Sequence, residues 1–240
     1  MKATLSKKSI EKLKNLSQVT QECIIERQVR LQHSTSSIIL GMELKDLPDD
    51  FYLPINNLSQ FIKMVSKGAR DSSPATVEYE KMSRDIGLST KTVYQTTISF
   101  GKEKFSFFTK ETEDMLKNTE KDKNKKFRPQ AENFSFKITK DELSSLAGGA
   151  GTVGADVLNF VAEYNVVSIR AGHGSVEEAA SYNIEVPADE IKDFSEFALT
   201  ISNLNKIDSS NDYSIVMCEK ACMFNCEAEN MFYIFAPRRV

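Results

Sequence analysis

The stretch FYLPINNL at residues 51–58 returns near the C-terminus as FALTISNL at residues 197–204. Both read F-x-L-x-I-x-N-L, an alternation typical of a short strand that runs into the start of a helix. A second match precedes each of them, because LSKKSIEKL at 5–13 aligns with ITKDELSSL at 138–146. The shared pattern is an apolar residue, a hydroxyl residue, a lysine and two further apolar positions. Two features that recur in the same order, about half a chain apart, predict two copies of one domain.

Each copy is predicted to begin with a helix and to continue with short alternating strands and a second helix. This pattern indicates an α+β fold with largely antiparallel sheets and two helices per copy. We expect domain 1 at residues 1–110 and domain 2 at 132–240. Between them, residues 111–131 are highly charged and lack apolar periodicity, which predicts an exposed interdomain linker. The predicted strands are 22–26, 29–33, 37–40, 77–81, 92–100 and 105–109 in the first copy, and 158–162, 166–170, 213–218, 223–226 and 231–235 in the second.

Residues 149–154, GAGTVG, have the spacing G-x-G-x-x-G of a dinucleotide-binding loop. That loop needs a strand before the first glycine and a helix after the last. Here Thr139 and Glu142 have the spacing of a capping box, so a helix precedes the glycines, and strand-like residues 157–162 follow them. The order is the reverse of the cofactor motif. We therefore interpret Gly148-Gly149 as the end of the helix, the glycines after them as part of the following turn, and expect no bound cofactor.

The composition is that of a soluble globular protein, and no apolar run approaches the length of a membrane span. A cytoplasmic protein without membrane contact is the expectation. Cys218, Cys222 and Cys226 recur every fourth residue, which is not the C-x-x-C spacing of a zinc site. We interpret them as small buried apolar residues and expect no metal. His33 and His173 lie in no catalytic motif, so we expect no enzymatic activity.

The lysines of the two helices of the first copy are the candidate functional residues. At about 100° per residue, Ile10, Leu13 and Leu16 form an apolar stripe on the first helix. The lysines of this helix, 7, 8, 12 and 14, are predicted to lie opposite that stripe or on its flanks. In the second helix, Lys63 and Lys67 are predicted to point away from the apolar face. Lysines without interleaved aromatic residues favour contact with phosphates over base stacking.

Two repeated domains, each with two helices over a sheet and with lysines on the outer helix faces, resemble a DNA sliding clamp, and in particular the clamp of T-even-type bacteriophages. The resemblance rests on the helix that begins Leu5-Ser6-Lys7, on residues 50–62, and on their copies at 138 and 197. It implies helices that line a central hole and sheets that form the outer wall. It also implies a closed ring of six domains, hence a homotrimer.

The partners implied by the resemblance are double-stranded DNA, held without sequence preference, a replicative DNA polymerase and a clamp-loader ATPase. For a viral protein the location is the cytoplasm of the host cell. The candidate DNA-binding residues are Lys7, Lys8, Lys12, Lys14, Lys63, Lys67, Arg70, Lys140 and Lys206.

The second copy departs from this pattern, because its helices offer only Lys140 and Lys206 as basic candidates while Asp141 lies opposite Leu143. If the chain is a clamp, its inner charge is concentrated in the first copy. The alternative is a duplicated β-rich structural or protein-interaction protein that does not encircle DNA. That alternative explains the repeat but not the excess of lysine.

Overall fold

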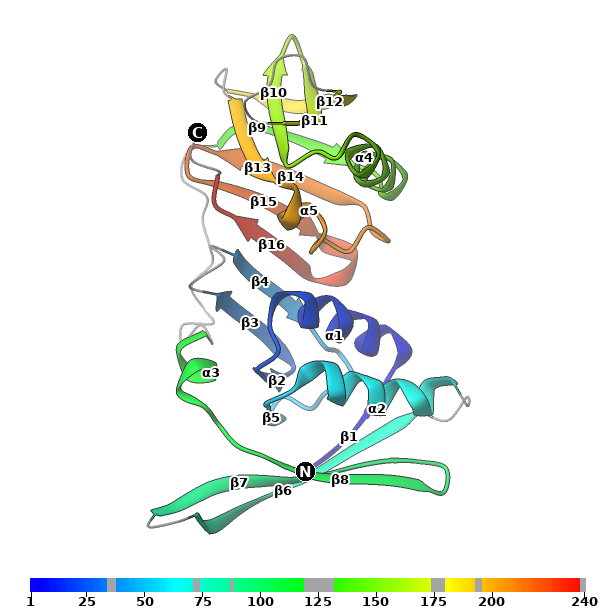
Figure 1. Ribbon diagram of the computed structural model, residues 1–240, viewed down its shortest axis with the longest axis vertical. Coiled ribbons are helices and arrows are strands. Elements are labelled where there is room, and N and C mark those ends of the chain that lie inside the picture. Colours follow the sequence, from blue (N-terminus) through cyan, green and yellow to red (C-terminus); the bar gives the residue numbers. More distant parts are fainter. Residues whose placement is uncertain are drawn as a thin grey trace. The chain divides into compact units, whose positions relative to one another are not determined.

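The computed structural model describes residues 1–33, 38–70, 74–86, 89–118, 132–173, 180–192 and 196–237, with backbone alone at 33, 68–70, 86, 89, 117 and 118. The chain divides into two compact units (Figure 1). Unit 1 comprises residues 1–35 and 40–123, and unit 2 comprises 36–39 and 124–240.

Unit 1 packs two helices against antiparallel strands. Its elements are, in order, β1 (Lys2–Leu5), α1 (Lys7–Val19), β2 (Cys23–Glu26), β3 (Gln28–His33), β4 (Ile38–Glu43), β5 (Tyr52–Ile55), α2 (Leu58–Arg70), β6 (Ala75–Ile86), β7 (Ser89–Phe100) and β8 (Glu103–Thr109). One sheet has the order β1-β6-β7-β8, β2 pairs with β5, and β3 lies beside β4. A short helix, α3 (Glu113–Asn118), follows β8.

Unit 2 repeats this order. Its elements are β9 (Glu132–Ile138), α4 (Lys140–Val153), β10 (Val157–Glu163), β11 (Val166–Gly172), β12 (Tyr182–Ile191), β13 (Glu196–Thr200), α5 (Ile201–Leu204), β14 (Tyr213–Cys218), β15 (Ala221–Cys226), the 3-10 helix η1 (Glu227–Glu229) and β16 (Met231–Phe235). The strands run β13-β10-β11-β12-β9-β14-β15-β16. As β1 pairs with β6 and β2 with β5, so β9 pairs with β14 and β10 with β13. The prediction of two copies of one antiparallel α+β fold is confirmed.

The repeated sequence features mark equivalent places in the two units. Residues 51–58 cover β5 and the start of α2, and residues 197–204 cover β13 and α5. Their alternate apolar side chains are buried, except for Ile201, which is half-buried. Ser6 and Thr139 are the N-caps of α1 and α4, and Thr139 forms the predicted capping box with Glu142. Caps and apolar alternation therefore specify the same entry into each helix.

Helix α4 does not end at Gly148-Gly149 as predicted, but continues through both and through Gly151 to Val153. Its end is at Gly154, whose φ of 64° is in the left-handed region that glycine adopts without strain. The reason is packing. A Cβ at Gly149 would lie 2.3 Å from Cγ of Tyr182 on β12, so glycine allows that ring to lie against the helix. The predicted order of helix, glycine and strand is confirmed, since β10 begins at Val157.

Three strands were not predicted, namely β1, β9 and β12. The alternation of Phe134, Phe136 and Ile138, all buried, was a usable signal for β9. In β12 the signal is masked by Pro187 and by acidic residues, and the pairing with β9 is irregular between Ala188 and Glu190.

Two helices also differ from their predictions. Helix α5 ends at Leu204, so Lys206 lies beyond it. The segment that follows, NKIDSSND, is rich in turn-forming residues, and Asp208 accepts a hydrogen bond from the backbone of Ser210. The segment predicted as an exposed linker starts with α3, whose Met115 is buried against unit 1. Residues 119–131 of that segment lie outside the described residues.

Candidate nucleic-acid interface

The first turn of α1 is fixed by polar contacts to the loop after β4. The Ser6 hydroxyl accepts a hydrogen bond from the backbone N–H of Ser9 at 3.2 Å. The carboxylate of Asp46 accepts from the Ser6 backbone N–H at 2.8 Å and from the Ser9 hydroxyl at 2.5 Å. Partial burial acts to raise the pKa of Asp46, but these hydrogen bonds and the charge of Lys12 outweigh it and lower the pKa below its ordinary value of 3.8. Asp46 therefore anchors the helix in its ionised form.

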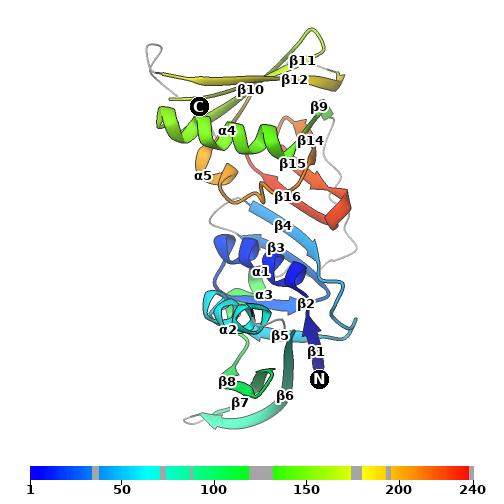
Figure 2. The same cartoon turned by 90° about the vertical axis from the view of Figure 1, so that its right-hand side faces the viewer.

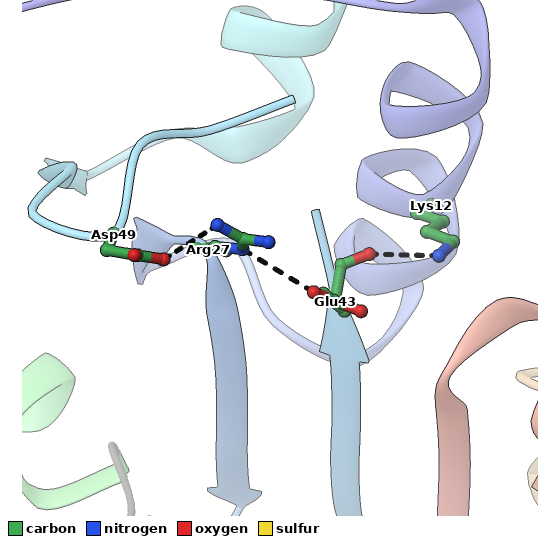
Figure 3. Close-up of polar contacts among 4 residues, drawn as sticks. All are labelled: Lys12, Arg27, Glu43 and Asp49. Atoms are coloured by element: carbon green, nitrogen blue, oxygen red, sulfur yellow. Dashed lines mark hydrogen bonds and ion pairs between the residues drawn. The ribbon is translucent and has the colours of Figure 1, made fainter. Parts of the chain in front are cut away.

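Lys12 is not on the outer face of α1, where the sequence predicted it. Its side chain is only 6% exposed, and its Nζ donates to the backbone carbonyl of Glu43 at the end of β4 at 2.9 Å (Figure 3). The Glu43 carboxylate contacts Arg27 at 3.4 Å, and Arg27 in turn contacts Asp49 at 2.7 Å. Lys12 thus joins a helix to a strand and is removed from the candidate interface.

The reason for this error is the true position of the buried face. Ser9 is buried together with Leu13 and Leu16. At about 100° per residue, Ser9 and Leu16 lie on the Lys12 side of Leu13, so the buried face is rotated toward Lys12. The polar partners Glu43, Arg27 and Asp49 were not predicted, because they come from separate segments of the chain that only the fold brings together.

Four lysines of unit 1 remain on exposed helix faces. Helices α1 and α2 lie side by side in both views (Figures 1 and 2). Most of their apolar residues are buried beneath them, while the lysines at 7, 8, 63 and 67 are exposed. We call these four residues, Lys7, Lys8, Lys63 and Lys67, the lysine surface.

Lys14 and Lys67 of these helices have acidic partners. Lys14 pairs with Glu11 at 2.7 Å, with both side chains about half exposed. Lys67 pairs with Glu103, and its ammonium lies 5.8 Å and 5.6 Å from the ring centroids of Phe100 and Phe105. Exposed pairs of this kind contribute about 0–1 kcal/mol, so a phosphate competes with the carboxylate at little cost. Lys14 is the weaker candidate because Glu11 shares its helix face.

The remaining candidates do not extend the lysine surface. Lys140 is exposed at the first position of α4, where its backbone N–H donates to Asp212 at 2.7 Å. Lys206 lies 3.4 Å from the side-chain oxygen of Asn203, and burial lowers its pKa. The side chain of Arg70 lies outside the described residues. Beyond Lys140, the exposed residues of α4 include Asp141, Gly148 and Gly151 and no further lysine.

The described residues contain no cluster of three or more His, Cys, Asp and Glu side chains that could hold a metal. The four cysteines are buried and form no disulfide, and burial raises the pKa of Cys23 to about 12. They behave as apolar residues, as predicted. No helix in the described part of the chain is long and apolar enough to cross a membrane.

Neither a scan against protein-family models nor a search of curated protein sequences gives a match for this chain. Among solved structures, the chain is similar to the proliferating cellular nuclear antigen from Entamoeba histolytica. The TM-score is 0.63 at 10% sequence identity, and the match covers 99% of this chain and 98% of that one. The chain therefore shares the fold of that protein, and in this chain short antiparallel strands and a few helices recur in two copies.

Proposed function

We propose that this protein is a DNA sliding clamp, a ring that encircles duplex DNA and tethers a replicative DNA polymerase. The observation that carries the proposal is the lysine surface on α1 and α2 of a duplicated clamp-type fold. Lysines there would contact phosphates without reading bases, and such contacts are weak enough to permit sliding. Retention on DNA would be topological and would need no catalytic residue, so we propose no enzymatic activity and no cofactor.

We further propose that three chains close the ring through edge strands, one from each unit. On unit 1, β8 pairs only with β7 among the described strands, and its Phe108 is 47% exposed. On unit 2, β12 pairs with β9 only from Ala188 onward, which leaves the second edge of its N-terminal half open in the described part of the chain. Joining these edges would satisfy backbone groups that otherwise invite aggregation.

The finer assignments follow the sequence resemblance. We propose residues 1–110 and 132–240 as the clamp domains, with 111–131 as the connecting segment. We also propose the T-even bacteriophage type, a clamp-loader ATPase as the partner that opens the ring, and the host cytoplasm as its location. The rival function, a duplicated β-rich interaction protein, would share the fold but would have no use for the lysine surface.

The test is retention on a nicked plasmid circle. The protein is incubated with the circle at high concentration, so that rings that open transiently close around it, and the DNA-bound fraction is isolated by gel filtration. We expect protein to remain with the circle and to leave after a single restriction cut, while light scattering gives the mass of a trimer. Equal retention on circular and cut DNA, or a monomer at tens of micromolar, would contradict the proposal.

A further inference from the structure

The hairpin of β6 and β7 extends well past the sheet that holds its base. Each of the two strands has 12 residues, whereas the equivalent β14 and β15 of unit 2 have six. Strand β8 pairs with β7 only from Tyr94 to Phe100, and β1 pairs with β6 only from Ala75 to Glu78. Residues 81–86 and 89–93, which we call the arm, therefore have no strand partner outside the β6–β7 hairpin among the described strands (Figure 1).

Few contacts stabilise the arm. Arg84 lies over the ring of Phe108 on β8, 4.2 Å from its centroid, Lys81 lies 5.9 Å from the Tyr94 ring centroid, and the Thr90 hydroxyl donates to Asp85 at 2.7 Å. A two-stranded ribbon is marginal by itself. Most of the arm's described side chains are exposed, and Val93 is the buried exception. Arg84 lies directly opposite Lys91 in the register, and like charges in that position destabilise a strand pair. With Lys81 also exposed, and with Asp85 as the one acidic residue of this 11-residue set, the arm has a formal charge of +2. An acidic partner would relieve this repulsion.

The open edge strand of unit 2 has the opposite charge. Within Tyr182–Ile191 there are three acidic residues, Glu185, Asp189 and Glu190, and no basic one. All three are exposed. Glu190 is paired with Lys192 at 3.4 Å, but Glu185 and Asp189 form no ion pair with a described residue. The strand that has the open edge is therefore also acidic, with Glu185 in its open half and Asp189 where its pairing with β9 is irregular.

We propose that the arm of one chain docks on β12 of a second copy, where Arg84 and Lys91 face Glu185 and Asp189. This inference rests on the proposed self-assembly and adds to it a charged contact from the arm, which extends beyond the paired length of β8. It predicts that assembly weakens as salt rises, because ions screen exposed charge pairs. It also gives the ring a direction, since the unit 1 arm fits unit 2 of a neighbour and not another unit 1.

The test is a charge swap measured by light scattering over a dilution series at about 0.1 M salt. Arg84→Glu with Lys91→Glu should raise the protein concentration at which half of the chains are assembled by about tenfold or more. Glu185→Lys with Asp189→Lys should do the same. The chain that carries all four substitutions should assemble close to the wild-type level. Lys2→Glu with Lys220→Glu, two exposed lysines outside the arm, is the matched control and should have little effect.

The single substitution Lys91→Glu guards against a folding artefact. It places a carboxylate opposite Arg84 across the hairpin and leaves the contact between Arg84 and Phe108 in place, so it should not lower thermal stability. Normal assembly of both double variants would overturn the inference, as would a four-substitution chain that stays dissociated. Loss of DNA retention with unchanged assembly would also overturn it and identify the arm as a DNA contact. A wild-type chain that stays monomeric would instead contradict self-assembly itself, and with it the proposed function.

Discussion

Units 1 and 2 share an order of elements and a pattern of strand pairing, but they differ in what their helices present. In unit 1, α1 and α2 have 13 residues each and carry the lysine surface. In unit 2, α4 contains three glycines and α5 has only four residues. The comparison teaches that caps and buried apolar positions specify this fold, while the exposed helix residues are free to serve another purpose.

The two units also use different contacts to hold a helix against its neighbouring strand. In unit 1 a buried charge, Lys12, joins α1 to the end of β4. In unit 2 the absence of a side chain at Gly149 lets α4 contact Tyr182 on β12, where the tyrosine hydroxyl lies 2.5 Å from the Ser145 hydroxyl. Each device is local to its unit, so substitutions should separate them.

The largest difference is expected between two adjacent glycines of α4. Gly149→Ala should lower the free energy of unfolding by about 2 kcal/mol, because the new methyl group collides with the base of the Tyr182 ring. Gly148→Ala meets no atom within 4 Å and should raise it by about 0.5–1 kcal/mol through helix propensity. Urea denaturation of both variants measures this difference. Equal effects would show that Tyr182 does not pack on the helix.

The next effect concerns two lysines of α1, Lys8 and Lys12, that were both predicted to point away from its apolar side. Lys12→Ala should cost about 2 kcal/mol, because the Glu43 carbonyl loses a charged donor in a buried position. Lys8→Ala, at an exposed position of the same helix, should change stability by less than about 0.5 kcal/mol. The same denaturation experiment compares the two. If Lys12→Ala leaves the stability unchanged, Lys12 returns to the candidate interface.

The smallest effect is the pH dependence contributed by Asp46. Its pKa is lower in the folded chain than the ordinary 3.8, so the unfolded chain binds more protons near that pH. The stability that Asp46 contributes is therefore present above about pH 4 and is lost as the pH falls through the folded pKa. The Asp46→Asn variant should be less stable than wild type at pH 7, and this difference in the free energy of unfolding, the gap, should narrow below pH 4. A gap that stays constant with pH would contradict the ionised anchor.

The sequence predicts the duplicated fold because its signals are local. The N-caps Ser6 and Thr139 and the repeated F-x-L-x-I-x-N-L pattern determine where helices and strands begin. The end of α4 was missed because it depends on a contact between Gly149 and Tyr182, which are far apart in sequence. The burial of Lys12 was missed for the same reason, since Glu43 and Asp46 lie on a different segment. Exposed lysines are predictable from a helical wheel, whereas a lysine at the margin of the buried face is not.

The central claim is that the lysine surface on the helices of unit 1 holds the DNA. It follows that this positive charge can be removed without loss of the fold. The measurement is the lifetime of the protein on a nicked plasmid circle at several salt concentrations, for two variants of equal charge. One replaces the lysine surface, Lys7, Lys8, Lys63 and Lys67, with alanine. The other replaces four exposed lysines outside it, Lys2, Lys45, Lys137 and Lys220.

Both variants should keep the wild-type fold and mass, because exposed substitutions usually change stability by less than about 0.5 kcal/mol. We predict that the lysine-surface variant leaves the circle at least about tenfold faster at moderate salt and has a shallower dependence of lifetime on salt, since fewer phosphate contacts release fewer ions. The control should behave like wild type on any DNA sequence. If the control variant leaves the circle faster while the lysine-surface variant has the wild-type lifetime, the account is contradicted.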